Sequence, residues 1–432
     1  MNDTETGGAS DRLLDGPAVI LGNAKSLFVQ QLAETWRDRG LDVVIITESS
    51  NIPECSPDGI RIVNSHDYRR RNLRWLRVVN PVLRFAERMM PRILNRQYRH
   101  RTGRQAPESW EWYWVDNLWD SFCRARAAKA CRPAFVFGQE ASSYGLATSL
   151  CDGIPRILFP WGGDIFNYVE TSPVLNWMTT RALRNVDLIV PSSATAAEYI
   201  PRRFGVDCSR VVPVSWGVDL KLFRPADSER RSELLKQYAI PENSRIIVNA
   251  RRFKAMWGAL DALEVCLTTA ARHRDLHCIF LGGTGTQEAI EVARERVTNA
   301  GLQNQFTFLA EDISLKHYAD ILAVADVFLS LLGRGDMRSS SVLQGAACGG
   351  TPIIVDSPEY RMMTAQGFAA EFVPEGDIDA LSNTIERLLS SEDERVRIRS
   401  ANLDFVSTHE DHDRQMARLL ELIDNVCARY RP

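Results

Sequence analysis

The fold is decided near the start of the chain by PAVILGNAKSLFVQQLAETWRDRGLDVVIIT, residues 17–47. The run PAVILG (17–22) is short and continuously apolar, which is typical of a strand buried on both faces of a parallel sheet. A helix that stops at Gly40 is predicted next, and DVVIIT (42–47) predicts a second strand. The helix has apolar residues near helical spacing at Leu27, Phe28, Leu32 and Trp36. A strand, a helix and a strand of this length favour a parallel sheet covered by helices on both faces.

Length and composition indicate an ordinary globular protein with room for two such sheets. The 432 residues exceed one ordinary core and suit two domains of about 200 residues each. Hydrophobic residues make up 45% and charged residues 25%, which excludes disordered and fibrous classes. A formal net charge of −3 excludes a molecule built as a whole to bind polyanions.

Strand and helix signals alternate through both halves of the chain. A third strand is predicted over 60–63, and the stretch over 220–244 predicts an interdomain linker because it is charged and carries FRPAD and PENS. Helices are predicted over 173–185 and 193–204, and further strands over 134–138, 156–161, 187–190, 211–214, 245–250, 277–283, 306–310, 326–332 and 351–356. The expected fold class is α/β with two doubly wound Rossmann-like sheets, whose ligands bind at the carboxyl ends of the strands.

Cysteine usage and the N-terminal sequence predict a cytoplasmic protein. The nine cysteines are scattered and form no C-x-x-C pair that would hold a metal or carry redox chemistry. The first residues, MNDTETGGASDRLLDG, lack the apolar segment of a signal peptide. No run reaches the roughly 18 apolar residues that span a bilayer.

The segment DMRSSSVLQGAACGGTPIIVD (336–356) is the strongest candidate for chemistry. Val342 to Ala347 predicts a short buried helix, led by Ser339, Ser340 and Ser341 and followed by a Gly-Gly turn and a strand. The N-terminus of such a helix presents free N–H groups and a positive dipole end, which suits a phosphate. The alternative interpretation is a plain capped helix of the core.

This segment resembles the nucleotide-sugar motif of the retaining family 4 (group 1) glycosyltransferases of the GT-B fold. Their motif is E-x7-E followed by small residues and a proline; here Asp336 and Gln344 hold the two acidic positions, and the run ends at Pro352. In the family the first acidic residue touches the donor sugar and the second holds the ribose. Gln344 keeps hydrogen bonding but loses the charge that strengthens a ribose contact.

Further segments extend the resemblance over roughly residues 134 to 425. They are EASSYGLATSL (140–150), LFPWGGDIFNY (158–168), the PSSATAAEYI to FRP stretch (191–225), VNARRF (248–253), YADILAVADVFLSL (318–331) and EDHDRQMARLLELI (410–423). The resemblance implies two Rossmann-like domains facing a central cleft. Residues 1–222 would be the acceptor-side domain, 223–410 the nucleotide-sugar domain, and 411–432 a helix that crosses back to the first domain.

The donor-side candidates gather after strands and before the serine-led helix. Cationic groups there would stabilise the charge of a departing nucleoside diphosphate. The candidates are Arg251, Arg252, Lys254, Ser339, Ser340, Ser341 and Gln344, with Gly283 and Gly22 in glycine loops after strands. Asp336 is the catalytic candidate. Each arginine also has the interpretation of a solvated surface residue, and Gly22 that of a tight turn.

The acceptor-side candidates lie in the first half of the chain. They are Asn23, Glu140, Trp161, Gly162 and Gly163, and Trp161 stands where many family members carry a histidine. Asp164 is the second catalytic candidate, as a polar group near the reacting sugar. It has an alternative role as the cap of the helix that follows the loop.

The sequence predicts no metal and no cofactor beyond a nucleotide sugar as co-substrate. No D-x-D motif stands in a suitable context, and the histidines do not form a set of metal ligands.

An insertion at about 66–120 is basic and aromatic. Residues Arg69 to Arg104 include twelve arginines, no lysine and one glutamate, interleaved with bulky apolar residues. This pattern favours contact with an anionic membrane surface, and therefore a peripheral position at the inner membrane face. ESWEWYWVDNLWD (108–120) adds four tryptophans for a membrane, a sugar or the core. The alternative is a helical insertion paired with acidic residues; nucleic acid is not an expected partner, because no recognised fold accompanies the arginines.

Together these features predict a glycosyltransferase that moves a sugar from a nucleotide diphosphate sugar to the hydroxyl of a glycan or lipid-linked acceptor. The resemblance implies retention of configuration and a role in cell-surface polysaccharide or glycolipid assembly. The alternatives are a non-catalytic protein of the GT-B fold that binds or scaffolds, and a sugar-nucleotide epimerase.

Overall fold

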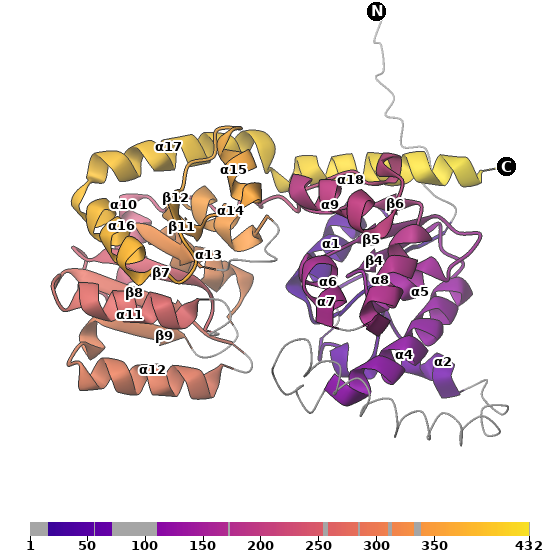
Figure 1. Ribbon diagram of the computed structural model, residues 1–432, viewed down its shortest axis with the longest axis horizontal. Helices are drawn as coiled ribbons and strands as arrows, with labels where there is room; N and C mark the ends of the chain where they lie inside the picture. Colours follow the sequence, from indigo (N-terminus) through magenta and orange to yellow (C-terminus); the bar gives the residue numbers. More distant parts are fainter. Residues whose placement is uncertain are drawn as a thin grey trace, which may run out of the picture. The chain divides into compact units, whose positions relative to one another are not determined.

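A computed structural model describes residues 16–55, 57–70, 110–171, 173–253, 258–283, 286–309, 313–331 and 338–431. The chain forms two compact units, each built on one six-stranded parallel sheet (Figure 1). The first unit comprises residues 1–214 and 418–432, and the second comprises 215–417.

The sheet of the first unit has the strand order β3-β2-β1-β4-β5-β6. Its strands are β1 (Ala18–Leu21), β2 (Val43–Thr47), β3 (Arg61–Asn64), β4 (Phe135–Gln139), β5 (Arg156–Phe159) and β6 (Leu188–Ile189). Ala18 of β1 pairs with Val43 on one side and Phe135 on the other, so β1 and β4 are neighbours. The order reverses between them, and such a switch point is where doubly wound sheets bind ligands.

Helices cover both faces of this sheet. They are α1 (Leu27–Asp38), α2 (Ser65–Arg70), α4 (Trp110–Ala130), α5 (Ser143–Ser149), α6 (Gly163–Phe166), α7 (Tyr168–Thr171), α8 (Pro173–Arg184) and α9 (Ala194–Phe204). On one face Trp36 of α1 meets Phe135 and Phe137 of β4 edge-on. On the other face α4 and α5 pack against alternate residues of the same strands. The set of buried residues predicted for α1 is wrong at its start. Leu27 is exposed, and Val29 is buried instead.

The second unit repeats the same topology. Its strand order is β12-β11-β10-β7-β8-β9. When these strands are numbered from β7 and read from the opposite edge, the order is that of the first sheet. The strands are β7 (Arg245–Arg252), β8 (Leu276–Leu281), β9 (Phe306–Leu309), β10 (Val327–Ser330), β11 (Thr351–Val355) and β12 (Glu371–Val373). The helices are α10 (Ser228–Gln237), α11 (Ala259–Ala270), α12 (Gln287–Asn299), α13 (Leu315–Ala323), α14 (Ser340–Ala347), α15 (Pro358–Thr364), α16 (Ile378–Ser390) and α17 (Glu392–His409). The last helix, α18 (His412–Cys427), begins in the second unit and belongs to the first unit from Arg418 onward. Here the switch point lies between β7 and β10.

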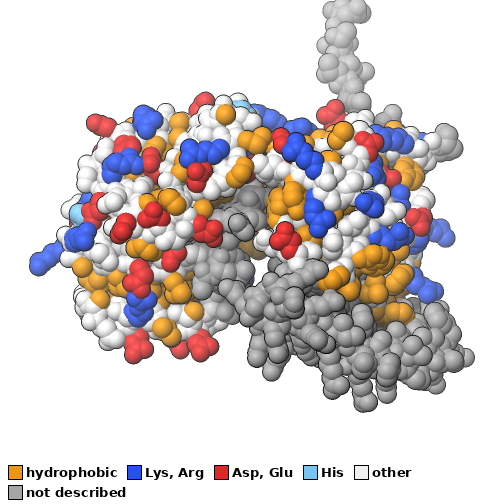
Figure 2. Space-filling model, viewed as in Figure 1, with side chains coloured by type: hydrophobic (Ala, Val, Ile, Leu, Met, Phe, Trp, Pro, Cys, Tyr) orange, Lys and Arg blue, Asp and Glu red, His pale blue; other side chains and the backbone are white. Residues whose placement is uncertain are grey.

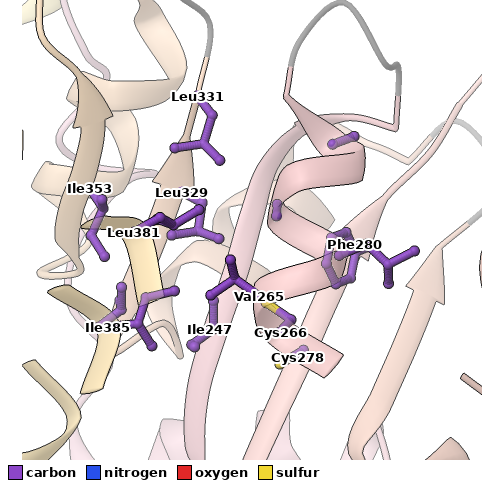
Figure 3. Close-up of a cluster of buried hydrophobic side chains, with 14 of the residues drawn as sticks. Ile247, Val265, Cys266, Cys278, Phe280, Leu329, Leu331, Ile353, Leu381 and Ile385 are labelled. Atoms are coloured by element: carbon purple, nitrogen blue, oxygen red, sulfur yellow. The ribbon is translucent and has the colours of Figure 1, made fainter. Parts of the chain in front are cut away.

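Two hydrophobic layers hold this second sheet in place. Ile246 and Val248 of β7 point into the layer with α10, α13, α14 and α17, and Ile247 points into the opposite layer. Figure 3 shows the opposite layer, in which side chains of α11 and α16 meet those of β7, β8, β10 and β11. Since neighbouring strand residues alternate between faces, continuous apolar runs fit strands buried on both sides.

The sequence prediction is wrong at the join between the two units. The chain passes from the first unit to the second after Val214, not at 222. The predicted linker over 220–244 contains α10, whose Leu234 and Leu235 belong to the second unit's core. The predicted strand over 211–214 is reduced to a single bridge between Val211 and Ile189.

The described surface is of mixed charge. On the face drawn in Figure 2, acidic and basic side chains are interspersed over each unit. None of the described helices is long and apolar enough to cross a membrane. The nine cysteines are all free thiols.

Candidate functional site

Arg251 marks the switch point of the second sheet. It comes from the end of β7, and its Nε donates to the Oγ of Ser330 at the end of β10 over 2.9 Å. Its Nη2 donates to the Oγ of Ser339, which precedes α14, over 2.7 Å. One guanidinium thus spans the two strands at which the order reverses and the N-terminus of a helix. This is the position at which an anion would be bound in such a sheet.

The N-terminus of α14 presents backbone N–H groups that have no acceptor among the described residues. The Oγ of Ser339, the N-cap residue, contacts Arg251 and Ser341 and makes no capping hydrogen bond. Within the described part of the chain, no acceptor bonds the N–H groups of Ser340 and Ser341. All three serines are half-buried. Two N–H groups, a positive helix end and a guanidinium together make a site suited to phosphate.

The remainder of α14 explains the small residues of the motif. Gln344 is half-buried one turn after Ser340 and Ser341, so it lies on the same helix face. A Cβ at Gly345 would stand 2.7 Å from the ring of Phe328 on β10, so this glycine lets the helix approach the sheet closely. The small residue at 345 therefore serves packing against the neighbouring strand.

The other donor-side candidates have different surroundings. Arg252 is exposed at the end of β7. Gly283 follows β8 at the same sheet edge with a φ of +123°, and its carbonyl accepts from Thr286. Lys254 and Asp336 lie outside the described residues, and their roles stay predictions.

Arg338, just before the serines, ties the start of α14 to a buried acidic pair. Its Nη1 donates to Oε1 of Glu410 over 2.6 Å, and its Nε donates to Oε1 of Glu359 over 3.0 Å. The two glutamate side chains are 0% and 2% exposed. Burial raises the pKa of Glu410, and the Arg338 charge acts against that rise. Glu410 also accepts from the hydroxyl of Ser215, the first residue of the second unit.

In the first unit, Gly22 and Asn23 form a tight turn after β1. A Cβ at Gly22 would lie 3.0 Å from Val29 of α1 and 3.3 Å from Gln139 of β4. The Oδ1 of Asn23 accepts from the N–H of Lys25 over 2.9 Å. These contacts account for both residues by local packing and turn formation, the alternative that the sequence left open for Gly22.

Asp164 holds two loops of the first unit together. It is 1% exposed, and its carboxylate accepts from the N–H groups of Trp161 and Gly162 in its own loop and of Ala141 in the loop after β4. Burial raises the pKa of Asp164, and these N–H groups act against the rise. Because its oxygens face backbone donors, the geometry favours a positioning role over contact with a substrate.

The loop residues beside Asp164 are ordered by packing. The indole of Trp161 lies 5.1 Å from the ring of Phe28 and 5.8 Å from that of Phe159. Gly162 has a φ of +103°, which explains its glycine, and Gly163 begins α6.

Glu140 stands at the switch point of the first sheet, directly after β4. Its φ is +80°, a backbone conformation that non-glycine residues rarely adopt. Its carboxyl is half-buried and accepts from the hydroxyl of Ser142. Burial raises the pKa of Glu140 to about 7, and the charge of Asp164 adds to the rise.

A buried polar cluster that the sequence analysis did not identify adjoins Glu140. Glu48, which follows β2, accepts from Arg124 and from the hydroxyl of Tyr144 over 2.9 Å each. The Arg124 guanidinium lies 4.4 Å from the centre of the Tyr144 ring and also bonds Ser143. Glu48 and Ser330 share one signal that could have identified them, a polar residue at the carboxyl end of a buried strand. Arg338 lies within the segment 336–356, for which the sequence indicated a phosphate site but no ion pair.

No group of three or more potential metal ligands occurs among the described side chains. The expectation of metal-free chemistry stays a prediction. The arginine-rich residues 71–104 lie outside the described part, as do the side chains of Trp110, Trp112 and Trp114.

Comparisons with known proteins agree with this architecture. The chain is similar to a curated relative, D-inositol 3-phosphate glycosyltransferase of Corynebacterium glutamicum (strain R), at 21% identity over 224 residues. That match covers 50% of this chain and 51% of the relative, so the chain spans about half the length of the curated relatives it matches.

Solved structures match almost the whole chain. Sucrose-phosphate synthase from Thermosynechococcus elongatus has a TM-score of 0.72 at 15% identity, over 96% of this chain and all of that one. Anabaena HepE in complex with UDP has a TM-score of 0.66 at 13% identity, over 95% of this chain and all of that one. At these identities the likeness shows the fold, which is GT-B with two Rossmann-like domains.

Two family descriptions match the two halves of the chain. Residues 26–217 match the glycosyl transferase 4-like domain, and residues 230–404 match glycosyl transferases group 1. The second range contains both Arg251 and the serine-led helix α14. Both matched families are glycosyltransferase domains, so the chain carries the two domains of a glycosyltransferase.

Proposed function

We propose that this protein transfers a sugar from a nucleoside diphosphate sugar to an acceptor hydroxyl. The observation that carries the proposal is the guanidinium of Arg251, placed by Ser330 and Ser339 at a helix N-terminus whose first N–H groups have no acceptor among the described residues. Breaking the bond between the sugar and the diphosphate leaves negative charge on the diphosphate. Preorganised cationic and N–H donors stabilise that charge in the transition state.

A uridine nucleotide is the first donor to test. The structurally similar HepE has been crystallised with UDP and with UDP-glucose. In this proposal the diphosphate lies at Ser340 and Ser341, and Gln344 reaches the ribose one helical turn further on. Asp336 contacts the donor sugar, as the family resemblance implies.

The acceptor belongs to the first unit in this proposal. Its strand ends present Glu140 and the cluster around Glu48 and Arg124, groups that hydrogen-bond hydroxyls well. Retention of configuration, and a role in cell-surface polysaccharide or glycolipid assembly at a membrane surface, follow from the family resemblance and the arginine-rich insertion.

The donor can be identified by thermal unfolding with UDP-, GDP-, ADP- and dTDP-sugars. A ligand that binds only the folded protein, present at about 100 times its Kd, adds roughly 2.7 kcal/mol of stability. We expect one nucleotide to raise the Tm clearly and the others much less, because the site must distinguish bases. Replacing Arg251 by alanine should reduce the rise, because donor binding is weakened.

Turnover separates this proposal from its rivals. Transfer of the sugar to a hydroxyl should release nucleoside diphosphate from the selected donor. Chromatography of the reaction mixture measures this release. Binding without any release would contradict the proposal and support a binding or scaffold protein. Interconversion of the donor sugar with no acceptor present would instead indicate an epimerase.

A further inference from the structure

Carboxylates gather at the carboxyl edge of the first sheet. Glu48 follows β2, Glu140 follows β4, and Asp164 lies in α6 after β5. Burial raises the pKa of Glu140 most, to about 7, and the charges of Asp164 and Glu48 add to the rise. The cation that acts against the rise is Arg124 of α4. The charges that act most on Glu140 are therefore two carboxylates and one guanidinium.

The guanidinium of Arg124 is already paired. Its side chain is 2% exposed, and its Nη2 donates to Oε2 of Glu48 over 2.9 Å. Its Nη1 donates to the hydroxyl of Ser143. The Glu48 side chain is only 18% exposed, so a second anion that drew Arg124 away would leave a buried carboxylate without its cation. Arg124 is therefore not available to balance the charge of a phosphate on a ligand.

Hydrogen-bonding atoms remain at this edge for uncharged groups. Oε1 of Glu140 accepts from the hydroxyl of Ser142, whereas no described residue donates to Oε2. The preceding residue, Gln139, is 2% exposed, and neither atom of its side-chain amide has a partner among the described residues. Its Cβ and Cγ lie 3.3 and 3.4 Å from where a Cβ of Gly22 would stand, which places this side chain at the switch point between β1 and β4. Buried polar groups are nearly always hydrogen-bonded, so the amide indicates a ligand with polar groups of its own.

Hydroxyl groups match both of these residues, and a phosphate does not. A hydroxyl donates to a carboxylate oxygen, and it both accepts from and donates to an amide. A phosphate dianion has no proton to give to Glu140. Its charge would also be repelled by the carboxylates of Glu140, Glu48 and Asp164.

We propose that the first unit binds its acceptor through uncharged hydroxyl groups, as a sugar or polyol presents them, and discriminates against acceptors that carry a phosphate near those hydroxyls. The assignment names the acceptor class of the glycosyl transfer proposed above and rests on that proposal. Glu140 and Gln139 bind the acceptor, and Arg124 holds Glu48 in place. All of these residues lie within the first unit.

The test measures acceptor binding in the absence of a donor. Glucose, mannose and myo-inositol are each compared with a monophosphate of the same compound in ligand-observed NMR titrations of the full chain. The ionic strength is held constant, because salt screens the interaction between charges. The pH is kept about one unit above the pKa of Glu140, which burial raises to about 7, so that its carboxylate is mostly ionised.

Two variants test whether Glu140 contributes to the discrimination. Glu140→Gln removes one negative charge and keeps the size of the side chain and its ability to hydrogen-bond. Asp152→Asn removes the same charge from a side chain of the same unit that is 80% exposed, and serves as the control. Thermal unfolding verifies that each variant is folded. The comparison within the wild type decides the proposal even if Glu140→Gln does not fold.

We expect the wild type to bind at least one of the neutral compounds, and to bind its monophosphate at least about tenfold more weakly. Glu140→Gln should reduce this difference, and Asp152→Asn should retain it. The proposal is overturned if a monophosphate binds as tightly as its parent compound, if no neutral compound binds, or if a folded Glu140→Gln keeps the full difference. The proposed function fails by a separate result, namely that no donor yields nucleoside diphosphate.

Discussion

Replacing Arg251 by alanine should reduce glycosyl transfer more than any other single change in the described donor site. The variant loses the cation that Ser330 and Ser339 place at the start of α14. Removing one preorganised donor to a developing negative charge costs about 100- to 1,000-fold in rate. We expect kcat/KM for the donor to fall by about that factor, with donor binding also weakened. Initial rates over a range of donor concentrations measure both quantities.

Three further variants make the result specific to this guanidinium. Arg251→Lys keeps the charge but not the fork that reaches two serines, so it should recover only part of the rate. Arg252→Gln tests the exposed neighbour, for which we expect a much smaller loss. Arg202→Gln changes a 79% exposed arginine of the first unit and serves as the control. Equal losses for Arg251→Ala and Arg202→Gln would remove Arg251 from the donor site.

The parallel sheets were predictable from the sequence because their strands carry a strong local signal. The run PAVILG is apolar throughout and RIIVNA has an apolar centre, since both faces of each strand are buried. The strand order is different, because it depends on pairings such as β1 with β4 across more than 100 residues. No local pattern encodes that pairing. The topology had to come from the family resemblance, or from the structure.

The misplaced boundary has a local cause. Charged helix α10 has only a narrow apolar stripe, in which Leu234 and Leu235 supply the buried contacts. The proline and the charges around it suggest a linker when they are read without tertiary context. The burial of those two leucines in the second unit overrides that local pattern.

The residue types of the candidate site were predictable from the sequence, but the contacts between residues distant in the sequence were not. Serines before a helix and arginines after a strand indicate a phosphate site, and the structure brings Arg251 and Ser339 within hydrogen-bond distance. The sequence could not show that Asp164 uses its oxygens on backbone N–H groups, or that Glu140 has a positive φ. Both properties arise from the meeting of two loops, after β4 and after β5.

Replacing Arg338 by methionine should strongly destabilise the second unit. The change keeps much of the apolar stem but leaves Glu410 and Glu359, 0% and 2% exposed, without their cation. Removing one partner of a buried ion pair costs about 3–5 kcal/mol, because the remaining charge stays desolvated. For a unit of about 200 residues this corresponds to a Tm lower by about 6–20 °C, which differential scanning calorimetry resolves.

Two comparisons show whether the buried charge is the cause. Arg361→Met breaks a surface pair with Asp356, in which the side chains are 57% and 46% exposed, and should lower the Tm far less than Arg338→Met does. Adding Glu410→Gln to Arg338→Met removes one stranded charge, so the double variant should recover part of the lost stability. A Tm for Arg338→Met equal to that of Arg361→Met would contradict the buried-pair explanation. Because Arg338 directly precedes Ser339, the ion pairs that stabilise this unit also fix the start of the helix proposed to bind the diphosphate.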